Sequence, residues 1–381
     1  MINTTATSVS LTALALVLLA PDLADAKQIA AHTRGTHPLV SSVSHLAPAP
    51  INQTTKGTID TAANGDGTYT KTVMGTANDK VVTTTDTFAD GVTVTSKSTD
   101  LTIKNSNGST SYDDTSTSNG KVTTSDETYT ATGVKGDYTV TGVVVQANGQ
   151  VDNVSGTSDK TSYGTDNNFT LTNSSDKTET LNTETLVDGN VVANVQTGTG
   201  FNGKAIDNVS LYTSGPMPTT PSVDTTPNGL GSYATGSNIV NGVKTVYSDR
   251  MFPNGAASAS SDVITSNANG STTYAQSTNA IASNGAISSS GSNETYTPNA
   301  SGGDSISGTF TQSNGYNGTV TGSEVKTGYG NDISLTYKDQ SNVTRVADTQ
   351  QLVDGNITLN VNTGTTFTGQ ASDSVGLIVS P

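Results

Sequence analysis

Short stretches in which apolar and polar residues alternate recur along the chain, separated by turns that contain glycine. Ile357, Leu359 and Val361 alternate with polar residues, as do Val92 and Val94, and this is the pattern of half-buried strands. Asn-Gly and Asp-Gly pairs separate many of the stretches, and both pairs suit two-residue hairpin turns, whose central residues need positive φ. After the N-terminal segment no helical stripe is found, so the pattern predicts an all-β protein.

The pattern occurs twice in the chain. Thr185–Asn190 (TLVDGN) returns as Gln351–Asn356 (QLVDGN), a shift of 166 positions (352 minus 186), and the same shift relates Tyr163 to Tyr329. Earlier segments match at slightly different shifts, as expected where loops have changed length. Because the matches gather near one shift, the sequence indicates two tandem homologous domains.

Sequential hairpins within each copy predict an antiparallel β-meander. The turns recur at intervals of about 12 to 17 residues, which predicts about eight to twelve short strands per copy. Such a meander can form an open sheet, a sandwich or a barrel. A β-solenoid is the alternative, although the tight repeat of about 20 to 30 residues that it requires is not found. Outward faces rich in Ser, Thr and Asn disfavour a barrel that spans lipid.

The first 26 residues have the features of an export signal. Leu11–Ala20 is apolar but too short to span a bilayer, Pro21 interrupts it, and Ala24–Ala26 provides small residues for cleavage. No Lys or Arg precedes the apolar run, which departs from the usual pattern. We expect cleavage and no membrane span in the mature chain; a retained N-terminal anchor is the alternative.

Prolines mark the limits of the two domains, because proline avoids the hydrogen-bonded interior of a sheet. They gather before residue 52 and again between residues 216 and 227. The predicted organisation is a signal peptide at 1–26, a flexible tether at 27–51, a first β repeat at 52–213, a Pro/Thr-rich linker at 214–229 and a second β repeat at 230–381.

Composition excludes several kinds of chemistry. The chain has no cysteine, which rules out thiol catalysis and Cys-ligated metals and favours a bacterial exported protein over a eukaryotic secreted one. Its three histidines, His32, His37 and His45, all precede the repeats, so neither repeat has an imidazole for acid–base work. The net charge of -15 argues against nucleic acid or anionic lipid as a partner. Large apolar residues are scarce enough to keep disorder as an alternative.

Tyrosine is the commonest aromatic residue, and three tyrosines coincide between the copies. Exposed tyrosine rings can stack on sugars, whereas the structural interpretation is packing across strands with the hydroxyl in water. The candidate ligand-binding residues are Tyr112 with Tyr274, Tyr129 with Tyr296, and Tyr163 with Tyr329.

Acidic residues indicate a catalytic or metal site less strongly than the tyrosines indicate a sugar-binding site. Glu127 and Glu294 match between the copies, and a pair of carboxylates can hydrolyse glycosidic bonds, but a solvated strand face is the simpler interpretation. Asn64–Thr68 and Gly302–Asp304 resemble fragments of calcium loops without the remaining ligands at their spacing. We therefore expect no cofactor and no catalytic site, with structural calcium as an alternative.

These observations favour a secreted or cell-surface, non-catalytic structural or adhesive protein of bacterial origin, with the periplasm as the alternative location; they do not indicate an oligomeric state. Its expected partners are cell-surface or matrix polymers, including polysaccharide. The alternatives are a tandem carbohydrate-binding module, a self-assembling β fibre subunit, and a polysaccharide-active enzyme that uses a carboxylate pair.

Overall fold

The computed structural model describes residues 50–118, 120–226 and 228–381, so the predicted signal peptide and nearly all of the predicted tether lie outside the described residues. The first half contains β1 (Ile51–Thr61), β2 (Gly65–Gly75), β3 (Asp79–Phe88), β4 (Thr93–Lys104), β5 (Thr110–Ser118), β6 (Lys121–Ala131), β7 (Tyr138–Val145), β8 (Val151–Lys160), β9 (Gly164–Asn173), β10 (Thr178–Asp188), β11 (Val191–Thr199) and β12 (Ala205–Ser214). The second half contains β13 (Ser222–Thr226), β14 (Gly229–Val240), β15 (Val243–Met251), β16 (Ala257–Ser266), β17 (Thr272–Ile281), β18 (Ile287–Pro298), β19 (Asp304–Gln312), β20 (Asn317–Lys326), β21 (Gly330–Asp339), β22 (Thr344–Asp354), β23 (Ile357–Gly364) and β24 (Ser374–Val379).

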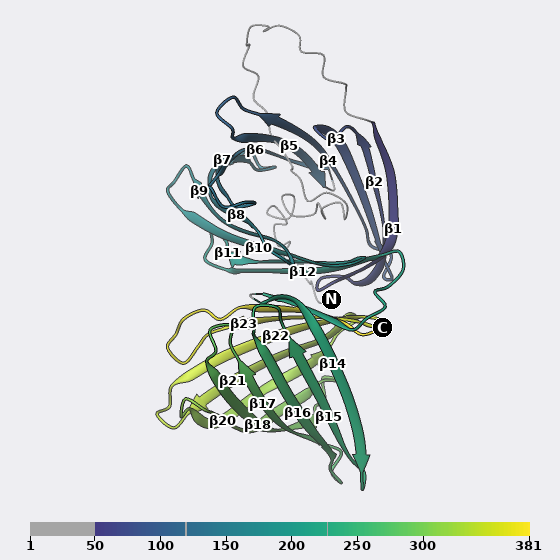
Figure 1. The fold of residues 1–381 in the computed structure, drawn as a ribbon, viewed down its shortest axis with the longest axis vertical. Helices are drawn as coiled ribbons and strands as arrows, with labels where there is room; N and C mark the ends of the chain where they lie inside the picture. The colour runs from purple at the N-terminus through teal and green to yellow at the C-terminus, as the bar shows by residue number, and fades with distance from the viewer. Residues whose placement is uncertain (1–49, 119, 227) are drawn as a thin grey trace, which may run out of the picture.

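These strands form two closed antiparallel barrels of the up-and-down type (Figure 1). Consecutive strands are neighbours throughout, and each ring closes by pairing its first strand with its last, β1 with β12 and β13 with β24. The predicted all-β fold with two tandem antiparallel meanders is confirmed, and of the three arrangements left open the chain adopts the barrel.

The second barrel begins at Ser222, earlier than the start at residue 230 that the proline distribution predicts. Strand β13 lies inside the segment 214–229, which we assigned to a linker, and it pairs with both β14 and β24. The connection between the barrels is therefore only residues 215–221, with Pro216, Pro218 and Pro221 in it. The prolines around β13 make this segment look like a linker, although a short strand can start directly after a proline.

Closure of the first barrel depends on a glycine. Gly57 of β1 pairs with Ser214 of β12, and a Cβ atom on Gly57 would lie 1.8 Å from the carbonyl oxygen of Thr213 and 2.9 Å from the Tyr69 ring. Only glycine fits where the backbone of the last strand approaches this closely.

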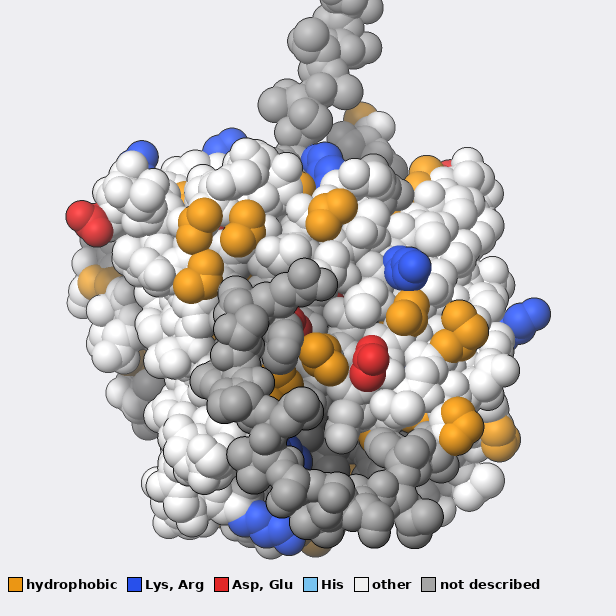
Figure 2. All heavy atoms as spheres, turned by 90° about the horizontal axis from the view of Figure 1, so that it is seen from above, with side chains coloured by type: hydrophobic (Ala, Val, Ile, Leu, Met, Phe, Trp, Pro, Cys, Tyr) orange, Lys and Arg blue, Asp and Glu red, His pale blue; other side chains and the backbone are white. Residues whose placement is uncertain are grey.

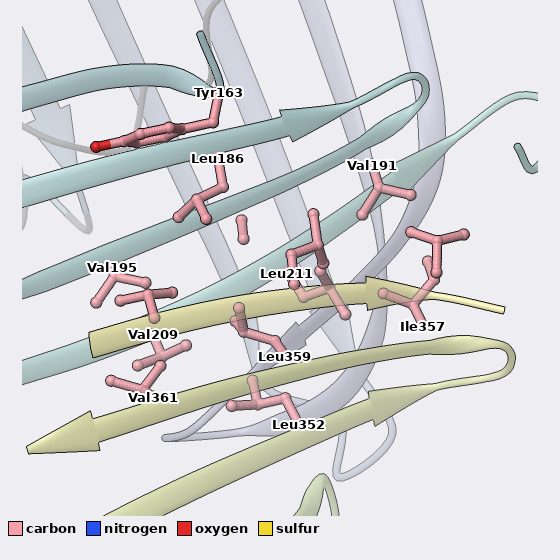
Figure 3. Close-up of a cluster of buried hydrophobic side chains, with 14 residues drawn as sticks. Tyr163, Leu186, Val191, Val195, Val209, Leu211, Leu352, Ile357, Leu359 and Val361 are labelled. Carbon is pink, nitrogen blue, oxygen red and sulfur yellow. The ribbon is translucent and has the colours of Figure 1, made fainter. Parts of the chain in front are cut away.

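The largest apolar cluster lies between the two barrels. Strands β10, β11 and β12 of the first barrel face β22, β23 and β24 of the second, as Figure 3 shows. The first barrel contributes Tyr163, Leu186, Val191, Ala193, Val195, Val209 and Leu211, and the second contributes Leu352, Ile357, Leu359, Val361, Val375, Leu377 and Val379. We call this set the inter-barrel cluster.

The inter-barrel cluster is symmetric in sequence. Shifting the first set by 166 positions gives Tyr329, Leu352, Ile357, Leu359, Val361, Val375 and Leu377, and all of these belong to the cluster or pack against it. Each barrel thus uses the same patch of its outer wall, which is the form of an isologous interface between two identical subunits.

Hydrogen bonds at the edge of the interface repeat this symmetry. The hydroxyl of Thr58 donates to the Asp354 carboxylate at 2.6 Å, and at the matching place Ser222 donates to Asp188. Both acceptors belong to the repeated Leu-Val-Asp-Gly-Asn turn. The Thr226 hydroxyl adds a bond to Glu184 at 2.9 Å. The relative position of the barrels is therefore fixed by both apolar and polar contacts.

Away from this interface the outer walls are mainly polar, with scattered exposed apolar residues such as Met74 and Tyr247. On β2 and β3 three outward pairs are threonines in cross-strand register, Thr68 with Thr87, Thr70 with Thr85 and Thr72 with Thr83. The Thr54 and Thr72 hydroxyls of β1 and β2 lie 3.3 Å apart. Figure 2 shows one end of the molecule, where uncharged polar side chains and backbone predominate and apolar side chains form small scattered groups.

Candidate functional site

The interior of the first barrel holds two tyrosines around a buried glutamate. Tyr112 of β5 pairs with Glu127 of β6, and the Tyr112 and Tyr129 rings meet edge to face with centroids 4.6 Å apart. The Tyr129 hydroxyl donates to Glu127 Oε2 at 3.1 Å. On the other side Glu127 pairs with Gly142 of β7, where a Cβ atom would lie 2.1 Å from the carbonyl oxygen of Asp126.

The second barrel repeats this arrangement. Tyr274 pairs with Glu294, the Tyr274 and Tyr296 rings meet edge to face at 4.9 Å, and the Tyr296 hydroxyl donates to Glu294 Oε2 at 3.3 Å. Gly308 takes the place of Gly142. We call the two arrangements the Tyr–Glu–Gly sites.

A hairpin beside each site is also preserved in atomic detail. The Asn105 amide donates to the Ser109 and Ser111 hydroxyls at 3.0 and 2.8 Å. In the second barrel the Asn267 amide donates to Ser271 and Thr273 at 3.0 and 2.9 Å. In each copy the first of these serines donates to an asparagine of the same turn at 2.7 Å. The hairpin beside each site is thus held by the same set of hydrogen bonds in both barrels.

Burial changes the protonation of the first site. It raises the pKa of Glu127 to about 7, although the hydrogen bond from Tyr129 opposes the shift. Nearby, burial and then the charge of Asp100 raise the pKa of Asp114 to about 8. At neutral pH the interior of the first barrel can therefore hold protons on carboxyl groups, which lets them donate as well as accept hydrogen bonds.

We expect Tyr129→Phe to raise the pKa of Glu127 above 7, because the lost hydroxyl stabilises the charged carboxylate. The measurement is a pH titration of the Glu127 side-chain carbonyl carbon by NMR. Tyr163→Phe is the control, since its hydroxyl bonds to Asp166 in another part of the barrel. A wild-type midpoint near the ordinary value of 4.5 would contradict the site as described.

The six sequence-predicted tyrosines divide into two groups. Tyr112, Tyr129, Tyr274 and Tyr296 line the barrel interiors in the Tyr–Glu–Gly sites. Tyr163 lies in the inter-barrel cluster and Tyr329 packs against it, with their hydroxyls donating to Asp166 and Asp332 at 2.5 and 2.6 Å. The last pair is therefore part of the interface between the barrels, and ligand binding by the other four stays a prediction.

The predicted calcium fragments lie apart from each other in the fold. Asp66 is on the outer face of β2 opposite Asp60, and Gly302 and Gly303 form the turn before β19. Among residues 50–118, 120–226 and 228–381 no group of three or more acidic or histidine side chains is placed to hold a metal ion.

Sequence reasoning missed two buried carboxylates at the interface. Asp60 and Asp224 are both 0% exposed and occupy matching positions on β1 and β13. Burial, then the charges of Asp66 and Asp354, raises the pKa of Asp60 to about 8. Burial, then the charge of Asp188, raises the pKa of Asp224 to about 7. The sequence signal that could have revealed these two aspartates is the repeated Thr/Ser-Ile/Val-Asp-Thr pattern at Thr58–Thr61 and Ser222–Thr225.

Comparison with known proteins assigns no family to this arrangement. No protein-family model matches the chain, and a search of curated proteins finds no significant match. Within the described part of the chain no helix has the length and apolar character needed to cross a membrane.

Proposed function

We propose that this protein is an exported, non-catalytic structural or adhesive component of a bacterial cell surface or extracellular matrix. The observation that carries the proposal is the symmetric inter-barrel cluster, which fixes two barrels with polar outer walls in one orientation. A rigid pair of this kind presents its Thr-rich faces to surrounding polymers in a constant geometry, as a spacer or adhesive module requires.

The second candidate is a carbohydrate-binding pair, and the repeated Tyr–Glu–Gly site favours it. Aromatic rings beside a hydrogen-bonding carboxylate suit a sugar, and two linked sites gain avidity on one polymer. The fibre alternative has less physical support, because β1 pairs with β12 and β13 with β24, which leaves neither barrel with an open sheet edge for growth.

The test combines fractionation of the producing cells with retention of the purified full chain on their extracellular polymers. We expect the protein in the surface or matrix fraction and retained on those polymers. The double variant Glu127→Gln with Glu294→Gln should be retained equally, because binding does not need a titrating carboxyl group. Replacing Tyr129 and Tyr296 together by alanine should abolish retention only if the Tyr–Glu–Gly sites bind the polymer.

Two results would overturn the proposal. One is a cytoplasmic location for the mature chain. The other is release of soluble sugar from the polymer by the wild type and not by the double glutamine variant, which would identify an enzyme that uses these carboxyl groups.

A further inference from the structure

Two arginines set the interior of the second barrel apart from that of the first. The chain has three arginines, and the two that the structure describes, Arg250 and Arg345, both face the interior of the second barrel. Arg345 lies an odd number of positions before Leu352, which faces the first barrel, so the two side chains are on opposite faces of β22. Arg250 pairs with Tyr233 on the inward face of β14.

The same positions of the first barrel carry acids. The pairs Tyr69–Asp86 and Leu171–Glu179 occupy the register positions of Tyr233–Arg250 and Tyr337–Arg345. Two carboxylates of one interior are thus matched by two guanidinium groups in the other.

The arginines lie near one rim of the second barrel. Every second hairpin of an up-and-down barrel is at the same end, so the end of β15 and the start of β22 share a rim with the β19–β20 turn and the β23–β24 loop. Arg250 is next to the end of β15 and Arg345 is next to the start of β22. Tyr316 belongs to that turn and Phe367 to that loop.

Aromatic rings surround Arg345. Its guanidinium carbon lies 4.3 Å from the centroid of the Tyr337 ring and 5.9 Å from that of Phe367. Phe367 stacks on Tyr316 with centroids 4.6 Å apart and an angle of 13°, and on Phe310 at 5.6 Å. Tyr316, Tyr337, Phe367 and Arg345 are all partly exposed, so solvent reaches the group.

The first barrel fills the same region with an apolar core. Its buried residues there are Val140, Val144, Val154, Phe169, Leu171 and Leu181. In the second barrel Ala347 occupies the position of Leu181, and Gly318 occupies that of the buried Asp152. At two further positions Tyr337 replaces Leu171 and Phe310 replaces Val144, so aromatic rings stand where the first barrel has aliphatic side chains. Partly exposed aromatic rings beside a polar group are typical of a binding surface.

We propose that the group of Arg345, Tyr316, Tyr337 and Phe367 at this rim of the second barrel binds a saccharide that carries a carboxylate group. A guanidinium group matches a carboxylate with two parallel hydrogen bonds, and flat aromatic rings cover the apolar face of a sugar. The Nε–H group of Arg345 is buried and has no acceptor among the described residues, so it is left to donate a hydrogen bond to a ligand oxygen.

This inference goes beyond the proposed function, because it assigns one ligand class to one barrel and holds for a structural protein, an adhesin or a binding module. It is tested on the purified full chain by calorimetric titration. The probes are a linear hexamer of galacturonate and, as the neutral counterpart, a linear hexamer of glucose.

We expect the uronate hexamer to bind and the neutral hexamer to bind more weakly. Arg345→Gln should weaken uronate binding about tenfold to a hundredfold, the effect of losing a charge-assisted hydrogen bond. Glu179→Gln, at the matching position of the first barrel, is the control and should leave the affinity unchanged. NMR shifts induced by the uronate should appear at Tyr316 and Phe367, which tests the site without a substitution.

Absence of uronate binding would overturn the inference, as would equal binding of the neutral hexamer. An equal loss in the Glu179→Gln variant would also overturn it, since the site would then not be specific to the second barrel. These outcomes leave cell-surface location and polymer retention untouched, so failure here is distinguishable from failure of the proposed function.

Discussion

Replacing Leu211 or Leu377 by alanine is expected to lower the free energy of unfolding by about 2 to 5 kcal/mol, the range for a fully buried leucine. Both side chains are 0% exposed, both lie in the inter-barrel cluster, and they occupy matching positions on β12 and β24. Because they contact each other's barrel, each substitution should destabilise both barrels. Denaturant unfolding followed by circular dichroism, with NMR probes in each barrel, measures the effect.

Ile239→Ala is the control for this experiment. Ile239 is 70% exposed near the tip of the β14–β15 hairpin, and an exposed apolar residue should contribute less than about 0.5 kcal/mol. If Leu377→Ala destabilised only the second barrel and left the first unchanged, the two barrels would be independent and the inter-barrel cluster would not be the main contact that we describe.

The form of the interface explains why two copies remain recognisable at these positions. An isologous contact requires each copy to keep the same patch, since every residue of the patch faces the patch of the other barrel. The turn Leu-Val-Asp-Gly-Asn is best preserved for this reason: its leucine enters the cluster, and its aspartate accepts the hydrogen bond from Thr58 or Ser222. Duplication thus preserves the contact surface while other regions diverge.

The sequence predicted the strands well because their signals are local. Alternation and Asn-Gly or Asp-Gly turns depend on neighbouring residues, and both copies carry them. Barrel closure was left open, since it depends on pairs that are distant in the chain, such as Gly57 with Ser214. Strand β13 was missed because its proline-rich surroundings resemble a linker.

The roles of individual side chains could be predicted only in part. Val191, Val192, Ala193 and Val195 form an almost continuous apolar run, which indicates a strand buried on both faces rather than one beside solvent. The matched tyrosines look alike in sequence, yet Tyr163 lies between the barrels and Tyr129 inside one. Whether a side chain points into the barrel or outward depends on the strand register and on the position of the other barrel. The local sequence pattern determines neither.

Stability is expected to fall as the pH rises from 5 to 9. In the unfolded chain Asp60 and Asp224 titrate near 3.8, whereas in the folded chain their pKa values are raised to about 8 and about 7. A raised pKa favours the folded state at low pH, and this contribution is lost as the pH passes through the folded values. Each pH unit between 5 and the folded pKa corresponds to about 1.4 kcal/mol, so the three units of Asp60 alone give an expected loss of about 4 kcal/mol.

The double variant Asp60→Asn with Asp224→Asn should be more stable than the wild type at pH 9 and should show a shallower pH dependence. Asparagine keeps the shape of the side chain and removes the charge that burial and the neighbouring Asp354 and Asp188 disfavour. Some slope should remain, because Asp114 and Glu127 inside the first barrel have pKa values raised in the same direction. Asp90→Asn, at an exposed turn, is the control and should leave the profile unchanged. If the double variant kept the full slope, the interface carboxylates would be ionised at neutral pH, and the contact between the barrels would then have to accommodate their charges.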